Sequence, residues 1–498
     1  MHCEARTLSD SASTPNTATG DALAASYDDV PYTSAPSPAR HPERLATIGQ
    51  LLGLDVPPVS NCRVLELACG DGASLLSIAA TLPDAHFVGV DFAAQPIARA
   101  RRMADAIGVA NVELMQLDIR ALPPDLGRFD YVIAHGLYSW IRAEVRAHLM
   151  PAIARHLAPG GVAYVSYNTL PGSYMRAVVW DMLKYHTREI ADTHGKLVPA
   201  RALLELVATP VATDSAGQQA MRSEVRDTAQ SSDAALAHDD LSEPNIPVHF
   251  HQFAADAARA GLAFLAEAHA NAMTVAGLAP HVRETLARLD RISREQYLDF
   301  IYFRRFRESL VCHSEALSRA VVEPARTLRL HALPSLEVRT AAARGEGNAM
   351  DAQASAIVRV LLERWPQSVP VAEIDARRKR DATQASPPTE RLVLDLYGAG
   401  MIELRTAPIS IARVAGERPR AFSAARWLTR DHEVIPSLYH APLRYRDPLG
   451  RALLALLDGS RTRAELCAEL GGPFAGAEGP GRLDRALGVL AGKALLVV

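Results

Sequence analysis

Three carboxylates stand where successive short apolar runs end: Glu66, Asp91 and Asp118. Gly70 and Gly72 follow the first run, and glycine lets a backbone approach a ligand closely and adopt positive φ. Such runs predict buried strands, and ligands of parallel α/β sheets bind outside the carboxyl ends of the strands. The spacing therefore predicts a nucleotide-type cavity at one edge of a sheet.

The charge of this cavity selects among nucleotides. A dinucleotide fingerprint reads G-x-G-x-x-G and holds a pyrophosphate at a helix N-terminus, whereas this chain reads G-D-G-A-S-L from Gly70 and lacks the third glycine. Glu66 and Asp71 would repel a pyrophosphate. The same negative field suits a ligand that has no phosphates and carries a positive centre, and S-adenosylmethionine, with its ammonium and sulfonium, is such a ligand.

Each carboxylate then has a role. Asp91 lies 19 residues after Gly72, where it can accept hydrogen bonds from both ribose hydroxyls. Asp118 can receive the adenine amine, with Ile119 against the ring. The predicted cofactor-binding residues are Glu66, Ala68, Gly70, Gly72, Asp91, Phe92, Asp118, Ile119, Ala134 and His135.

The elements that position these residues alternate between strand and helix. Apolar runs predict strands at 62–68, 85–92, 112–118, 129–135 and 161–167, and helical periodicity predicts helices at 45–54, 73–82, 97–108 and 145–157. This alternation indicates an α/β fold with a doubly wound, Rossmann-like parallel sheet. Residues 262–268 and 327–333 are the candidates for two further strands, with a helical cap between them. Residues 209–245 read as irregular and 294–313 as one helix.

Composition limits the function classes. A length of 498 residues predicts about three domains. The 53 Lys and Arg against 56 Asp and Glu give a net charge of −3, which argues against a dominant nucleic-acid or anionic-membrane footprint. No apolar run approaches the length of a spanning helix. The five cysteines form no CxxC pair, so we expect no bound metal, no disulfide framework and a reduced, cytoplasmic compartment.

Several segments resemble a bacterial family of class I methyltransferases that carry a methyltransferase regulatory domain and a C-terminal winged-helix module. They are SYDDVPYTS, ARHPERLAT, VLELACGDG, FVGVDFA, FDYVIAHGLYSW and GVAYVSYNTLPG, and the resemblance covers roughly residues 25–490. The family includes protein-lysine methyltransferases of outer-membrane surface proteins. It usually has glycine at the position of Ala68, so the fit requires that the loop does not need positive φ there.

The resemblance implies a domain order. We expect a disordered lead (1–22), a methyltransferase domain (23–205), a regulatory or cap region that can supply the last two strands (206–340) and two winged-helix-like modules (350–408 and 420–498). We also expect the two C-terminal modules to be dispensable for cofactor binding but needed for binding the acceptor.

The sequence leaves open which molecule accepts the methyl group. The fourth strand lacks the Asn/Asp-Pro-Pro-aromatic run of enzymes that methylate base amines, and the chain has no Pro-Cys dipeptide. A protein lysine amine is the favoured acceptor; a small-molecule acceptor and a cofactor-sensing scaffold are the alternatives, and a homodimer is left open. His135 is a candidate base, and no catalytic residue is assigned. The candidate acceptor channel comprises Tyr27, Tyr32, Tyr138, Trp140 and Tyr167.

Overall fold

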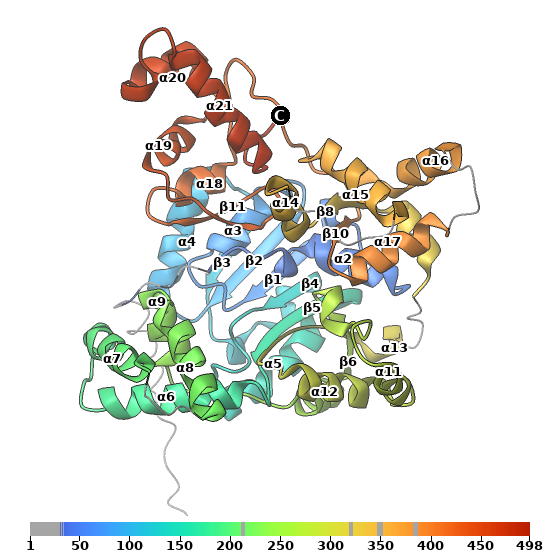
Figure 1. Ribbon diagram of the computed structural model, residues 1–498. Helices are drawn as coiled ribbons and strands as arrows, with labels where there is room; N and C mark the ends of the chain where they lie inside the picture. The colour runs from blue at the N-terminus through green and yellow to red at the C-terminus, as the bar shows by residue number, and fades with distance from the viewer. Residues whose placement is uncertain are drawn as a thin grey trace, which may run out of the picture.

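The computed structural model describes residues 30, 32, 34–210, 215–317, 322–345, 352–381 and 387–498; the predicted lead (1–22) and Tyr27 lie outside them. A central sheet has the strand order β3-β2-β1-β4-β5-β7-β6 (Figure 1). β1 to β5 are parallel, and β7 is antiparallel to both of its neighbours. The predicted α/β, doubly wound fold is confirmed. The seven strands are β1 (Arg63–Leu67), β2 (His86–Asp91), β3 (Val112–Gln116), β4 (Phe129–Ala134), β5 (Leu157–Asn168), β6 (Leu262–Glu267) and β7 (Phe306–His313).

Helices cover both faces of this sheet, which is why its strands read as continuous apolar runs. On one face, Val64, Phe87 and Ile133 share a buried cluster with residues of α2 and α3. On the other face, Leu65 and Val132 share a cluster with residues of α5 and α10. The helices around the sheet are α2 (Pro42–Leu51), α3 (Ala73–Ala79), α4 (Ala94–Ile107), α5 (Ala143–His156) and α10 (Phe250–Arg259).

The region after β5 is more helical than the sequence predicts. Within 209–245, Ser215 forms a capping box with Gln218 and begins a helix that the polar composition concealed. One turn of π-helix, η5 (Leu236–Asp240), follows. The helices of this region are α6 (Ser173–Thr187), α7 (Thr193–Ala208), α8 (Ala216–Ala229), α9 (Asp233–Ala235), α11 (Pro280–Ala287), α12 (Arg291–Tyr302) and α13 (Ser314–Leu317).

The predicted helix over 294–313 is wrong in its second half. α12 ends at Tyr302, Phe303 after it takes a left-handed conformation with φ 49°, and the chain then enters β7. This strand lies between β5 and β6, and no glycine or proline separates it from α12, so residues 294–313 read as one helix. The sixth strand is therefore where 262–268 predicts it, but the seventh is 306–313.

Residues 327–333 do not join the central sheet. Residues 324–329 form a 3₁₀ helix, and β8 (His331–Pro334) belongs to a separate sheet with the order β10-β8-β9. The boundary predicted at residue 340 therefore falls inside this small unit. Its other elements are α14 (Leu336–Ala343), α15 (Ala352–Arg364), β9 (Val369–Pro370), α16 (Val371–Asp381), α17 (Thr389–Gly398) and β10 (Ile402–Arg405).

The last region, from about residue 409, contains four α-helices, a short 3₁₀ helix (Gly472–Phe474) and a two-stranded sheet. It lies above α3 and α4 (Figure 1). The elements are α18 (Ser423–Leu428), β11 (Val434–Pro436), β12 (Pro442–Arg444), α19 (Pro448–Leu456), α20 (Arg463–Leu470) and α21 (Gly479–Gly492). The winged-helix assignment of both modules remains a prediction.

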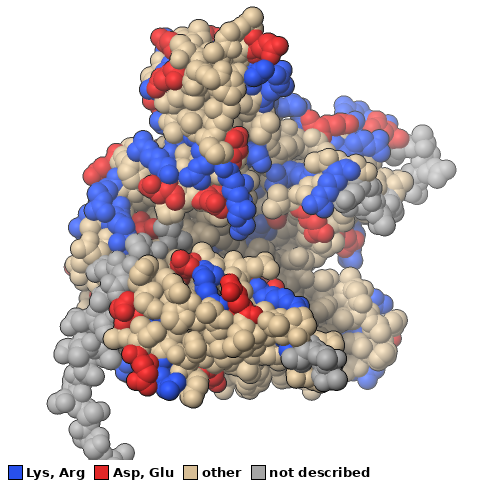
Figure 2. All heavy atoms as spheres, turned by 60° about the vertical axis from the view of Figure 1, so that its left-hand side comes forward, with Lys and Arg blue, Asp and Glu red and all other residues tan. Residues whose placement is uncertain are grey.

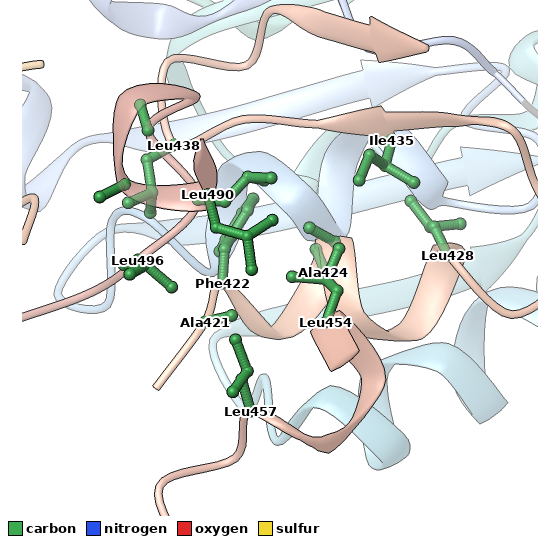
Figure 3. Close-up of a cluster of buried hydrophobic side chains, with 14 of the residues drawn as sticks. Ala421, Phe422, Ala424, Leu428, Ile435, Leu438, Leu454, Leu457, Leu490 and Leu496 are labelled. Atoms are coloured by element: carbon green, nitrogen blue, oxygen red, sulfur yellow. The ribbon is translucent and has the colours of Figure 1, made fainter. Parts of the chain in front are cut away.

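The C-terminal region is joined to the methyltransferase half by a continuous apolar core. Figure 3 shows this cluster, in which Phe422 and Leu428 belong to the C-terminal region. The same cluster includes Leu76 of α3 and Ala100 of α4. A chain shortened near residue 340 would expose these faces of α3 and α4 to water. Failure of such a chain to bind cofactor would therefore report on folding, not on the cofactor site.

Surface charge is mixed. Figure 2 shows Lys and Arg interspersed with Asp and Glu over one face, with neither sign gathered into a single broad patch. Within the described part of the chain, no helix combines the length and apolarity that crossing a membrane requires.

Candidate functional site

A cavity of about 580 Å³ lies along the carboxyl ends of the central strands. One end is lined by residues that follow β1, β2 and β3, and the other by residues near β5, β7 and η5. Of the predicted cofactor residues, the lining includes Ala68, Gly70, Asp91, Phe92, Asp118, Ile119 and His135.

The loop from β1 to α3 turns under this cavity. Gly72 has φ 70°, and a Cβ added there would lie 2.8 Å from the Cβ of Ala100 on α4. Gly72 is thus required for the turn and for close packing, and it does not line the cavity. Gly70 has φ 56°, and a Cβ there would meet nothing within 4 Å, so this backbone faces open space.

Ala68 has the positive φ that, from the sequence, this loop was expected not to need. Its φ is 58°, so the loop does need the left-handed conformation that alanine disfavours. This conformation costs a non-glycine residue roughly 1–2 kcal/mol. The loop keeps the turn nonetheless, because its neighbours fix it: Cys69 N–H donates to the carbonyl of Val90 at 3.0 Å, and Gly70 N–H donates to Asp91.

Asp91 connects the loop to the second strand. Its Oδ2 accepts a hydrogen bond from Gly70 N–H and its Oδ1 accepts one from Ala93 N–H, both at 2.9 Å. Each oxygen keeps a further lone pair for a ligand donor. Burial raises the pKa of Asp91, while its two backbone hydrogen bonds oppose that shift. A carboxylate held in this way can accept two hydroxyl hydrogen bonds, as a ribose would supply.

Glu66 lies beneath the loop and does not line the cavity. Its side chain is buried, and its Oε2 has no hydrogen-bond partner among the described residues. Arg40 Nη1 approaches Oε1 at 3.9 Å. Burial raises the pKa of Glu66 to about 7, Arg40 opposes this shift, and the charges of Asp71 and Asp91 add to it. A buried acceptor without a donor fits a ligand that brings a positive ammonium group.

The adenine end is more open. Asp118 is bound by Arg120, whose Nε donates to both carboxylate oxygens at 3.0 and 3.1 Å. This ion pair lowers the pKa of Asp118. Ile119 and Phe92 line the same end of the cavity with apolar surface. The residues present therefore fit S-adenosylmethionine: the carboxylate of Asp91 lines the cavity where its ribose would lie, Glu66 adds negative charge beneath the loop, and Phe92 and Ile119 offer apolar surface to its ring.

His135 follows β4 and faces the middle of the cavity. Its Nδ1 shares hydrogen bonds with the hydroxyls of Tyr164 at 3.0 Å and Ser166 at 3.1 Å. Burial, reinforced by the charge of Arg40, lowers the pKa of His135 to about 3. The imidazole is therefore neutral at physiological pH and is a poor base. Ala134 is fully buried in the sheet and does not line the cavity.

The predicted acceptor channel divides into two groups. Tyr32 and Trp140 line the cavity. Tyr138 and Tyr167 do not, because both are fully buried against Phe253, on which Tyr167 stacks with ring centroids 4.2 Å apart. The hydroxyl of Tyr167 is hydrogen-bonded to the hydroxyl of Ser309 at 3.0 Å. These two tyrosines belong to the core, and assigning them to the channel was wrong.

Other residues of this end were not in the predicted acceptor channel, although Asn168 was expected to end the fifth strand and to be able to face the acceptor. Asn168 ends β5 and pairs across the sheet with Phe306, the first residue of β7. Both line the cavity, with Arg176 of α6 and Asp239 of η5. Because β7 was predicted as helix and η5 as irregular chain, the sequence predicted Asn168 at this end but not Arg176, Asp239 or Phe306.

The fold and the cavity together define a class. A seven-stranded sheet with β7 antiparallel, a glycine loop after β1 and carboxylates after β1, β2 and β3 make this an S-adenosylmethionine-dependent methyltransferase. The cofactor is S-adenosylmethionine.

Comparisons with known proteins identify the family. Residues 64–161 match the family described as "Methyltransferase domain", and residues 232–313 match "Predicted methyltransferase regulatory domain". "Uncharacterized protein RP028" of Rickettsia prowazekii is 33% identical over 229 residues, which are 46% of this chain and 92% of that protein. The chain belongs to the family of methyltransferases that carry this regulatory domain.

Two further relatives extend this comparison. "Uncharacterized protein RP789" of Rickettsia prowazekii is 36% identical over 58% of this chain, and the matched segment spans 53% of that protein's length. The structure of PKMT2 from Rickettsia typhi in complex with AdoHcy covers 94% of this chain and 100% of its own, with a TM-score of 0.81 and 23% identity. At that identity the likeness establishes a shared fold across nearly the whole chain.

Proposed function

We propose that the protein transfers a methyl group from S-adenosylmethionine to a side-chain amine of a protein, most simply a lysine. The observation that carries this proposal is the two-ended cavity. One end presents Asp91 and Gly70 to the cofactor, and the other presents Trp140, Phe306 and a carboxylate, Asp239. An aromatic wall beside an acid suits a long aliphatic chain that ends in a cation.

Residues of the first end would hold the cofactor. Asp91 would bind the ribose, Glu66 would balance the ammonium beneath the loop, and Ile119 and Phe92 would contact the ring. Bound S-adenosylmethionine supplies an activated methyl group on a positive sulfur, so the chain itself needs to provide alignment more than covalent chemistry.

Residues of the second end would prepare the acceptor. An ammonium has no lone pair to attack with, so the acceptor amine must lose a proton first. Removal of the amine from water inside the cavity favours its neutral form, because burial lowers the pKa of an amine. His135 is unsuited to take this proton, since its own pKa is about 3. His135, the base candidate of the sequence, therefore does not fill this role.

The test asks which class of molecule receives the labelled methyl group. The full-length protein is incubated with methyl-labelled S-adenosylmethionine and a lysate of the host, and protein, nucleic acid and small solutes are separated. We expect label in protein, and much less of it with the Asp91→Ala variant at a limiting concentration of S-adenosylmethionine. Label only in nucleic acid or only in small solutes would contradict the proposal. A cytoplasmic location and a homodimer stay predictions, to be checked by fractionation and by light scattering.

A further inference from the structure

Asp239 stands out at the second end of the cavity. It lies in η5 (Leu236–Asp240), a single π-helical turn, and such turns occur frequently at functional sites. The side chains of its neighbours in the turn, His238 and Asp240, are hydrogen-bonded to other residues of the chain. His238 Nε2 contacts the carbonyl of Val30 at 2.6 Å, and Asp240 Oδ1 accepts hydrogen bonds from Arg176 and Trp180 at 2.9 Å. Asp239 instead lines the cavity.

The charges around Asp239 leave it without a partner. Three cations lie near this end, and each is already paired. Arg176 pairs with Asp240 at 2.9 Å, Arg305 pairs with Glu224 at 3.2 Å, and Lys184 pairs with Glu243 at 3.1 Å. Among the described residues, no hydrogen bond or ion pair reaches the carboxylate of Asp239.

A hydrogen bond to its backbone carbonyl holds Asp239 in place. Asn245 Nδ2 donates to the carbonyl of Asp239 at 2.9 Å, and Asn245 Oδ1 accepts from Asn168 Nδ2 at 2.8 Å. Asn168 ends β5, so the π turn is tied to the strand end where the cavity changes from cofactor to acceptor residues. Trp140 lines the same cavity, and its indole N–H is buried without an acceptor in the described part of the chain.

We propose that Asp239 binds the ammonium group of the acceptor and accepts one of its protons. This inference rests on the proposed function. In this step an N–H bond of the ammonium breaks and an O–H bond forms on the carboxylate. The amine nitrogen keeps the electron pair that attacks the methyl group. No other reactant is needed.

The environment of Asp239 suits a proton acceptor at neutral pH. Burial raises its pKa to about 7, the negative charge of Asp240 adds to the shift, and Arg176 opposes it. The other charged or titratable groups at this end of the cavity are His238, Glu243 and Arg305. Burial lowers the pKa of His238, so that residue stays neutral across the relevant range.

The experiment uses n-butylammonium as a mimic of the lysine side chain. Its binding to the full-length protein is measured by calorimetry with S-adenosylhomocysteine present. We expect Asp239→Asn to weaken binding at least tenfold. The control Glu144→Gln removes the same charge from the lining of the same cavity, near Arg120 at the cofactor end, and we expect a change of less than twofold. Equal weakening by both variants, or none by Asp239→Asn, would overturn the proposal.

A second measurement needs no variant. Because the pKa of Asp239 is raised, its carboxyl is neutral below that pKa and ionised above it. Affinity for n-butylammonium should therefore rise about tenfold between pH 6 and pH 8, as one group with a pKa near 7 ionises. Affinity that does not change over this range would contradict the assignment. Binding of S-adenosylhomocysteine should be the same in Asp239→Asn as in the unaltered protein, which confirms that the variant is folded.

The two proposals fail separately. If protein lysines are methylated and Asp239→Asn methylates them equally well at every pH from 6 to 8, the ammonium site is refuted and the proposed function stands. If n-butylammonium binding depends on Asp239 but label enters only small amines, the ammonium site stands and the protein acceptor is refuted.

Discussion

The two ends of the cavity are built in different ways. The cofactor end comes from three consecutive strand–loop units, in which short turns place Gly70, Asp91 and Asp118. The acceptor end joins Asn168, Asp239 and Phe306, which lie far apart in the chain. The first end follows from local rules for strands and turns. The second exists only once β7 and η5 have folded against β5.

The largest expected effect is a loss of stability, which should be greater for a core residue behind the acceptor end than for a residue of the cavity wall. Tyr167→Ala should lower the free energy of unfolding by about 3–5 kcal/mol, the usual cost of deleting a buried aromatic ring. Trp140→Ala, which removes a ring at the cavity wall, should cost less than about 2 kcal/mol but should weaken acceptor methylation. Urea denaturation of both variants measures the first effect. A larger loss of stability for Trp140→Ala than for Tyr167→Ala would contradict this division.

Side-chain alternation explains why the tyrosines could not be placed from the sequence. Successive residues of a strand point to opposite faces of the sheet. Tyr164 and Tyr167 of β5 accordingly lie in the clusters on opposite faces. The cavity meets the strand only at its end, so Asn168 reaches it and Tyr167 does not. A run such as AYVSYN predicts that a strand ends there. It does not show which residue lies at the very end of the strand, where its side chain can reach the cavity.

The cofactor end was predictable for the opposite reason. A strand, a glycine turn and a carboxylate at fixed spacing determine the local backbone, and parallel neighbours bring equivalent ends together. The sequence did not show which of these residues line the cavity and which lie beneath the loop. Glu66 and Gly72 support the loop from below, whereas Ala68 and Asp91 line the cavity. The seventh strand was missed because α12 ends before a phenylalanine in the left-handed conformation, and no glycine or proline marks the break in the sequence.

The next prediction sharpens the cofactor end. Asp91→Asn should weaken S-adenosylmethionine binding by about 1–3 kcal/mol, the usual loss for a charge-assisted hydrogen bond. Asp118→Asn should cost under about 1 kcal/mol, because this carboxylate is more exposed and already bound to Arg120. Calorimetry with the cofactor decides between them. If Asp118→Asn weakened binding more than Asp91→Asn, the roles given to the two carboxylates would have to be exchanged.

The smallest expected effect tests the strained turn. Ala68→Gly should stabilise the protein by about 1 kcal/mol, because glycine adopts φ 58° without the penalty that alanine incurs. Ala106→Gly, in the exposed part of α4, should do the reverse and cost about 1 kcal/mol. The midpoints of urea denaturation give both signs. A destabilising Ala68→Gly would show that the loop does not hold its alanine in the left-handed conformation.

The central claim is that this cavity methylates a protein amine, and peptide mass spectrometry tests it most directly. A surface-protein fraction of the host is treated with the full-length protein and S-adenosylmethionine, digested and compared with the same fraction treated with the Asp91→Ala variant. The account predicts mass steps of about 14, the replacement of one hydrogen by a methyl group, on lysine-containing peptides in the first sample alone. Mass steps confined to carboxyl or hydroxyl side chains, or none in any protein while a small solute gains the methyl group, would contradict it.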